Sequence, residues 1–186
     1  MPDAIKKDTT SSIKVEKLSE FKNTDLDDIC DATESTILDN KDSFNIGLNR
    51  SEPPVRERLE QYWNGVLLVP QRELIVGRLD DTISASIQLI KPNPNNQTSS
   101  FSCSVDQHFV APWARGHGLA KELLKAAEKE AKDQGHTVIR LRVNATLENA
   151  VKLYESFGFK RWGTLEKYEI IDGKMTPGHF FYKDIE

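Results

Sequence analysis

VDQHFVAPWARGHGLA, residues 105–120, is the stretch of sequence that decides the fold. It reads as an apolar-containing strand that runs into Pro112, a short loop with Gly116 and Gly118, and a long amphipathic helix that begins at Leu119. The start of a helix leaves roughly four backbone N–H groups without partners and carries partial positive charge, so it favours anions. Glycines let a phosphate approach the backbone because they have no Cβ. We therefore predict that this segment binds a pyrophosphate.

The glycine pattern excludes two common phosphate-binding motifs and matches a third. The loop is neither Gly-x-x-x-x-Gly-Lys-Ser/Thr nor Gly-x-Gly-x-x-Gly. It matches Arg/Gln-x-x-Gly-x-Gly/Ala at Arg115, Gly118 and Ala120, and here the chain resembles the GNAT superfamily of acyl-CoA-dependent N-acyltransferases. The resemblance implies acetyl-CoA as cosubstrate, with its pyrophosphate on the loop formed by Arg115, Gly116, His117, Gly118, Leu119 and Ala120.

A second motif strengthens the resemblance. Residues 143–159, VNATLENAVKLYESFGF, are similar to the superfamily signature Asn-x-x-Ala-x-x-Leu-Tyr-x-x-x-Gly-Phe. The matching positions are Ala150, Leu153, Tyr154, Gly158 and Phe159. Leu147 stands where the signature has Asn, so we expect no amide contact to the cofactor from that position. The resemblance covers about residues 73–185.

Size and composition limit the class of protein. The 186 residues predict a polar, disordered tail over 1–12 and a single domain over 13–186, which the resemblance implies is an N-acetyltransferase domain. A net charge of −4 argues against a nucleic-acid partner. The two cysteines, Cys30 and Cys103, are unpaired in sequence and indicate a reducing compartment. Without a long apolar run or a signal-peptide core, we expect a cytoplasmic protein with no membrane partner, and by resemblance a monomer or homodimer.

The order of predicted elements matches the fold that the resemblance implies. Hydrophobic periodicity and turn signals predict helices and strands that alternate along the chain. The expected helices span 25–38, after a cap at Asn23 or Thr24, and 55–63, 119–134 and 147–157. The expected strands span 13–18, 74–79, 83–90, 101–110, 137–143, 159–171 and 178–185, with residues 40–54 as a loop. This α/β order predicts a mixed, mostly antiparallel twisted sheet with helices on both faces.

The strand over 101–110 carries the candidate bases. An amine with a pKa near 10.4 must lose a proton before it attacks a thioester, so a general base is required. Asp106 and His108 occupy alternate positions and are predicted to project the same way. His108 has the better unperturbed pKa for a base, and Asp106 needs a raised pKa or serves to bind the ammonium, so both stay candidates. Cys103 is predicted to face the opposite side, which makes it a poor acyl-enzyme nucleophile and favours direct transfer in a ternary complex.

Other roles follow from the resemblance alone. It implies that Tyr154 is the general acid for the departing thiolate, although Tyr154 at its simplest packs beside Phe157. It also implies that the backbone N–H of Val110, with that of Phe109, polarises the thioester carbonyl. The C-terminal residues are faintly similar to the tabtoxin-resistance group of acetyltransferases, in which the region of Tyr168 lies near the acceptor. No metal is expected, because His136 and His179 lack ligand spacing.

We therefore predict an N-acetyltransferase that transfers an acetyl group from acetyl-CoA to a primary amine of a small molecule. Two alternatives stay open at this point. The first is a protein or peptide acetyltransferase that acts on N-termini or lysines. The second belongs to another class, a non-catalytic module that binds acyl-CoA as a sensor.

Overall fold

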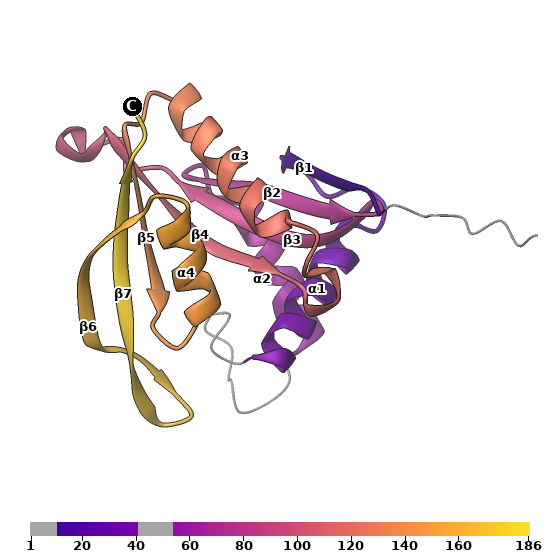
Figure 1. Ribbon diagram of the computed structural model, residues 1–186. Coiled ribbons are helices and arrows are strands. Elements are labelled where there is room, and N and C mark those ends of the chain that lie inside the picture. The colour runs from indigo at the N-terminus through magenta and orange to yellow at the C-terminus, as the bar shows by residue number, and fades with distance from the viewer. Residues whose placement is uncertain (1–10, 41–53) are drawn as a thin grey trace, which may run out of the picture.

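The structure is a computed structural model and describes residues 11–40 and 54–186. In this part of the chain seven strands form one sheet in the order β1-β2-β3-β4-β5-β7-β6 (Figure 1). The strands are β1 (Ile13–Leu18), β2 (Arg72–Leu79), β3 (Thr82–Ile90), β4 (Ser102–Val110), β5 (Val138–Asn144), β6 (Lys160–Ile171) and β7 (Lys174–Asp184). The helices are α1 (Asp25–Asp39), α2 (Arg56–Leu68), α3 (Leu119–Asp133) and α4 (Glu148–Ser156), with short 3₁₀ turns η2 (Gln97–Ser99) and η3 (Pro112–Ala114).

The contact between β4 and β5 is the feature of the sheet that creates a site. These neighbours run parallel, whereas every other pair in the sheet is antiparallel. They pair only where Ser102–Ser104 meets Val138–Arg140, and β5 then continues along β7 as far as Asn144. Beyond Ser104, β4 pairs only with β3 among the described residues. One edge of β4 is therefore open from Val105 to Val110.

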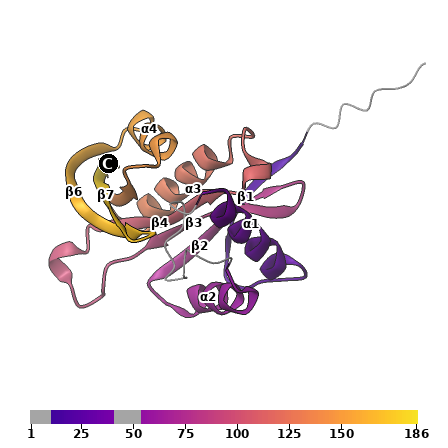
Figure 2. The same ribbon diagram turned by 90° about the horizontal axis from the view of Figure 1, so that it is seen from below.

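Helices cover both faces of the sheet. Figure 2 shows α3 and α4 on one face and α1 and α2 on the other. The face under α3 and α4 buries the stripe predicted for α3, namely Leu119, Leu123, Leu124, Ala127 and Ala131, against strand residues such as Ile87 and Leu89. The opposite face buries Ile29, Leu59 and Trp63 against residues that include Phe109. The sheet therefore has a separate hydrophobic core on each face.

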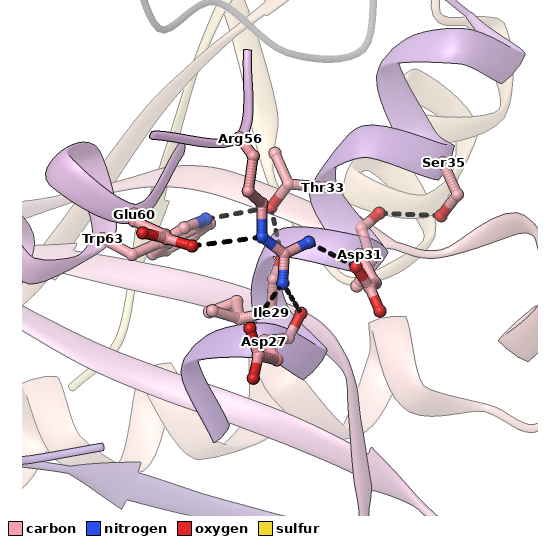
Figure 3. A network of polar contacts seen from close by, with 9 residues as sticks. Asp27, Ile29, Asp31, Thr33, Ser35, Arg56, Glu60 and Trp63 are labelled. Carbon is pink, nitrogen blue, oxygen red and sulfur yellow. Dashed lines mark hydrogen bonds and ion pairs between the residues drawn. The ribbon is translucent and has the colours of Figure 1, made fainter. Parts of the chain in front are cut away.

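A polar network fixes α1 and α2 to each other (Figure 3). The Arg56 guanidinium, at the start of α2, reaches Asp27 Oδ1 at 2.7 Å and Glu60 Oε1 at 3.4 Å and also contacts Asp31. These carboxylates are exposed, so each pair contributes only about 0–1 kcal/mol. Trp63 Nε1 donates to Thr33 Oγ1 at 3.0 Å and gives the buried indole its hydrogen-bond partner. The two helices therefore form one unit beneath the sheet.

The predicted element order and mixed sheet are confirmed, and the differences lie at element ends. Helix α2 extends to Leu68 rather than residue 63, and β7 begins at Lys174 rather than residue 178. Asp80 and Asp81, which connect β2 to β3, both have positive φ, as a tight hairpin turn requires. Thr24 precedes α1 without a side-chain cap bond to the backbone.

Two predicted segments fall partly outside the described residues, namely the tail over 1–12 and the loop over 40–54. Ser12, placed in the tail by the prediction, is held by hydrogen bonds to Asp80. No helix within 11–40 or 54–186 is long and apolar enough to cross a membrane.

Candidate active site

A β-bulge interrupts β4 at the centre of the site. Ser86 pairs with Phe109 and Gln88 pairs with Asp106, so two residues of β4, Gln107 and His108, lie opposite Ile87 alone. Gln107 has φ of 46°, a left-handed conformation that costs a non-glycine residue about 1–2 kcal/mol. Two contacts hold it there: its N–H donates to Asp106 Oδ1 at 2.9 Å, and its carbonyl accepts from Ser86 Oγ at 3.3 Å.

The bulge contradicts the prediction that Asp106 and His108 project the same way. Asp106 pairs with Gln88, whose amide donates to the Tyr62 hydroxyl of α2 at 3.0 Å. His108 instead contacts Tyr154 of α4 and the backbone of α3. An extra residue in a strand shifts the alternation by one, so the two side chains lie on opposite faces of the sheet. For the same reason, His108 shares the face of Cys103.

Backbone direction along β4 distinguishes Val110 from Phe109. Ala111 N donates to the Ser84 carbonyl of β3 at 2.8 Å. Because backbone N–H groups alternate between the two edges of a strand, the Phe109 N–H also points towards β3 and the Val110 N–H points away from it. The Val110 N–H therefore faces the gap that β5 leaves open, and Phe109 contributes its side chain to the core under α1 and α2.

The loop before α3 has the geometry of an anion site. Gly116 and Gly118 have φ of 85° and 84°, and a Cβ added at either position would project into open space. Gly118 is the N-cap of α3 and its carbonyl accepts from Lys121 and Glu122 N–H. In the described part of the chain, the N–H groups of residues 116–120 have no backbone partner outside regular elements. Successive free N–H groups at a helix start fit a pyrophosphate, so the residues present suit CoA.

A cleft of about 630 Å³ connects this loop to α4. Its size is typical of a cofactor site. It is lined by all the predicted cofactor residues except His117, and by residues of α4 that include Leu147, Ala150 and Tyr154. Thr36 and Asp39 of α1 line its other end. Leu147 gives the cleft an apolar wall at the position where the signature has Asn.

Arg115 makes an ion pair that the sequence did not predict. Its Nη1 lies 2.8 Å from Asp39 Oδ2, and both side chains are about half exposed. The resemblance places Arg115 in the loop that binds the pyrophosphate, and the structure pairs its guanidinium with the Asp39 carboxylate.

We expect Asp39→Asn to tighten acetyl-CoA binding by up to about fivefold, since an exposed ion pair that competes for Arg115 is worth about 0–1 kcal/mol. Calorimetric titration measures this change. In an Arg115→Ala background the same substitution should have no effect, and a gain in affinity there would show that Asp39 acts on the ligand itself.

Tyr154 and His108 meet at the inner end of the cleft. Tyr154 is only 6% exposed, and its hydroxyl lies 3.1 Å from His108 Nδ1. His108 Nε2 lies 3.0 Å from the Ala120 carbonyl in the first turn of α3. Burial, with the nearby Asp106 carboxylate, raises the pKa of Tyr154 above its usual value, so the phenol is protonated at neutral pH. Burial lowers the pKa of His108 to about 4, opposed only by the bond to Ala120.

A second, smaller cavity lies in the gap between β4 and β5, since residues of both strands line it. Its volume is about 110 Å³, and it shares His108, Leu147, Ala150 and Tyr154 with the first. It is also lined by Asp106 of β4 and by Tyr168 and Glu169 of β6. Tyr168 packs directly over Gly178, where an added Cβ would lie 2.2 Å from its ring. The two cavities therefore meet at Tyr154 and His108.

Sequence reasoning missed Glu169 and the role of Asn144. Asn144 is buried at the end of β5, and its amide donates to Glu169 Oε2 at 3.0 Å and to Thr176 Oγ1 at 3.1 Å. Its oxygen accepts from Thr146 N at 3.0 Å. Asn144 thus fixes a carboxylate at the second cavity. The sequence does show an Asn at the end of a predicted strand, which is a signal for a polar site. It does not show that the partner is Glu169, because the two residues are 25 positions apart.

The remaining candidate groups lie apart from this junction. Burial raises the pKa of the Cys103 thiol to about 12, so little thiolate forms at neutral pH. Cys103 is a poor nucleophile for this reason, whichever face of the sheet its side chain occupies. The His117 ring lies against the carbonyls of Ala114 and Arg115. His136 contacts the Ser100 carbonyl, and His179 contacts Thr164. No group of three or more potential metal ligands occurs in the part of the chain that the structure describes.

An open strand edge beside a helix start with free backbone N–H groups, with a buried phenol where the two meet, is the arrangement of an acyltransferase that uses an acyl-CoA thioester. Comparisons with known proteins agree. The model of the acetyltransferase (GNAT) family matches residues 36–159. An uncharacterized N-acetyltransferase encoded in the hisH-hisA intergenic region of Azospirillum brasilense is 43% identical over 136 residues, which are 73% of this chain and 78% of that protein. The chain belongs to the GNAT family and is an acetyltransferase.

Solved structures show the same fold. An N-acetyltransferase from Staphylococcus aureus Mu50 superposes with a TM-score of 0.76 at 19% identity, covering 94% of this chain and 99% of that one. The protein YncA of Salmonella typhimurium, whose structure contains its cofactor acetyl-CoA, has a TM-score of 0.70 at 13% identity and covers 94% of each chain.

Proposed function

We propose that the protein transfers the acetyl group of acetyl-CoA directly to the primary amine of a small molecule. The observation that carries the proposal is that two adjoining cavities lie at the open edge of β4 and share Tyr154 and His108. The larger one begins at the loop before α3, and the charged residues that line the smaller one are Asp106, Glu169 and Arg142. Two substrates held in two adjoining cavities can react in a ternary complex without a covalent enzyme intermediate.

Bound acetyl-CoA supplies an activated acetyl thioester. The N–H groups of residues 116–120 hold the pyrophosphate, and the Val110 N–H donates to the carbonyl oxygen as negative charge develops there. The acceptor ammonium loses one proton to Asp106, directly or through water, and that proton passes to solvent. The amine nitrogen then bonds to the acetyl carbon and loses its second proton to Asp106, which is ionised again and passes this proton to solvent as well. The carbon–sulfur bond breaks, the sulfur takes the Tyr154 proton, and Tyr154 is reprotonated from solvent.

Charge and volume at the second cavity support a small cationic acceptor. Two carboxylates, Asp106 and Glu169, line it together with one guanidinium, that of Arg142, and a carboxylate stabilises an incoming ammonium group before deprotonation. Its volume of about 110 Å³ holds the amine end of a slender molecule. The protein and peptide alternative would need the rest of a polypeptide to lie outside this cavity.

Asp106 is the proposed base, because the nitrogens of His108 are both engaged in hydrogen bonds. We expect Asp106→Asn to lower kcat/KM for the amine about 10²–10⁴-fold at neutral pH, with the deficit shrinking as pH approaches the pKa of the amine. Asn retains an oxygen to accept the Gln107 N–H, so the bulge is kept. Initial rates across pH measure the effect.

Glu169→Gln is the matched control, since it removes a charge from the same cavity. It should raise KM for the amine and leave kcat within a few fold, because Glu169 binds the ammonium and takes no proton. A larger kcat loss for Glu169→Gln than for Asp106→Asn would exchange the two roles.

Thiol release from acetyl-CoA, measured against amino acids, polyamines, aminoglycosides and N-terminal or lysine peptides, tests the function. The proposal predicts release that depends on a small amine. Faster release with peptides would favour a protein acetyltransferase. Tight acetyl-CoA binding with no acceptor-dependent release would favour the sensor module.

A further inference from the structure

The contacts of His108 determine its tautomer. Its Nε2 lies 3.0 Å from the Ala120 carbonyl, which only accepts hydrogen bonds, so Nε2 must carry the hydrogen. A neutral imidazole has one N–H, and Nδ1 is therefore an acceptor. Its partner at 3.1 Å is the Tyr154 hydroxyl, which must donate. One ring thus joins the first turn of α3 to the phenol of α4 in a defined direction.

The bulge of β4 directs the His108 side chain towards both Tyr154 and Ala120, so that one ring bridges α4 and α3. Without the extra residue at Gln107, His108 would share the face of Asp106 and point towards α2. The left-handed conformation at Gln107 is strained, and the contacts with Ser86 and Asp106 maintain it. The strained backbone therefore places His108 against α3 and α4.

We propose that His108 is a positioning residue that holds the Tyr154 hydroxyl in the resting site through its Nδ1 and ties it to the pyrophosphate-binding helix start through Nε2. The phenol has one hydrogen, so the hydroxyl turns from Nδ1 to the sulfur in the step that releases the thiol. This inference rests on the proposed acid role of Tyr154. Because Ala120 lies in the first turn of α3, the phenol is held at a set distance from the loop that binds the cofactor. The neighbouring Phe159 and Phe181 rings, 5.9 Å and 6.3 Å from the Tyr154 ring, orient the ring but offer the hydroxyl no partner.

A double-mutant cycle distinguishes positioning from an independent chemical role. We expect His108→Leu to lower kcat about 10–100-fold while KM for acetyl-CoA stays within about threefold. In a Tyr154→Phe background His108→Leu should cost less than about twofold more, since a residue that acts through Tyr154 has nothing left to position. Losses that multiply in the double variant would overturn the proposal.

His108→Gln is the conservative rescue. Its amide presents one acceptor and one donor, as the neutral ring does, but it cannot take up a proton. A positioning role predicts that Gln keeps a kcat at least about fivefold above that of Leu. Equal losses in the two variants would assign proton transfer to His108 and overturn the proposal. Acetyl-CoA affinity and melting temperature, measured for each variant, establish that the compared proteins are folded.

A spectroscopic measurement of the His108 tautomer tests the proposal independently of enzyme activity. Nitrogen-15 NMR of the histidine rings, with His108 assigned by its loss in His108→Gln, should show a protonated Nε2 and an unprotonated Nδ1 at neutral pH. A protonated Nδ1 would overturn the proposal even in an active enzyme. If no amine supports thiol release, the proposed function fails, and the tautomer still decides whether the bridge exists.

Discussion

Replacing Tyr154 by Phe should lower kcat about 10–10³-fold and leave acetyl-CoA affinity within about threefold, as expected when a general acid is lost from the step that releases the thiol. The substitution removes one oxygen from a buried ring that packs between Phe159 and Phe181, so the shape of the core is retained. Initial rates with acetyl-CoA and a saturating amine, and calorimetric titration with CoA, measure the two quantities.

A control on the same helix separates the loss of the hydroxyl from a general change in packing. Leu153→Met keeps the volume and an apolar side chain in the cleft and should leave kcat within about threefold. Removal of the Tyr154 hydroxyl also leaves His108 Nδ1 without its donor, which costs about 1–3 kcal/mol of stability. Rates must therefore be measured well below the melting temperature of the variant. Unchanged turnover in Tyr154→Phe would remove Tyr154 from the mechanism.

Placing a carboxylate at Gly118 should abolish productive cofactor binding. Gly118→Asp puts a negative charge at the N-cap of α3, where it occupies free N–H groups and repels the pyrophosphate. Asp tolerates the left-handed φ of 84° better than most residues, and its Cβ meets no atom of the protein. We expect the Kd for acetyl-CoA to rise at least about 100-fold, equivalent to about 3 kcal/mol, with the fold retained.

Two further glycine variants separate charge from backbone strain. Gly118→Asn adds a similar volume without charge and should weaken binding less than Gly118→Asp. Gly135→Asn introduces the same kind of strain at φ of 82° beyond the far end of α3 and should leave affinity unchanged. Equal affinities for wild type and Gly118→Asp would show that the pyrophosphate does not bind at this helix start.

The sequence predicts the parts of the fold that depend on local pattern. The apolar stripe from Leu119 to Ala131 repeats at helical spacing, so the pattern alone indicates helix α3 and its buried face. The loop over 115–120 could also be predicted from the sequence, because two closely spaced glycines directly before a helical pattern indicate a glycine loop at a helix start. The end of α2 could not be predicted as well, since Gly65 and the apolar run from Val66 show no clear helical periodicity.

The resemblance implies a splayed strand, commonly with a bulge, but the position of the bulge at Gln107 could not be predicted from the sequence pattern. The directions of the side chains around it were therefore predicted wrongly. A strand pattern assumes strict alternation, but Gln107 adopts a left-handed conformation that its side chain does not signal. The conformation depends on contacts with Ser86, a residue 21 positions away. Glu169 was not predicted for the same reason. Contacts between residues distant in the sequence, namely the bond to Asn144 and the pairing of β6 with β7, bring it to the site.

Initial rates with acetyl-CoA and the best small amine varied together test the central claim most directly. Direct transfer in a ternary complex predicts thiol release that requires the amine and reciprocal plots that intersect. Parallel plots would indicate an acetylated enzyme, and release independent of every amine would contradict the proposed transferase reaction.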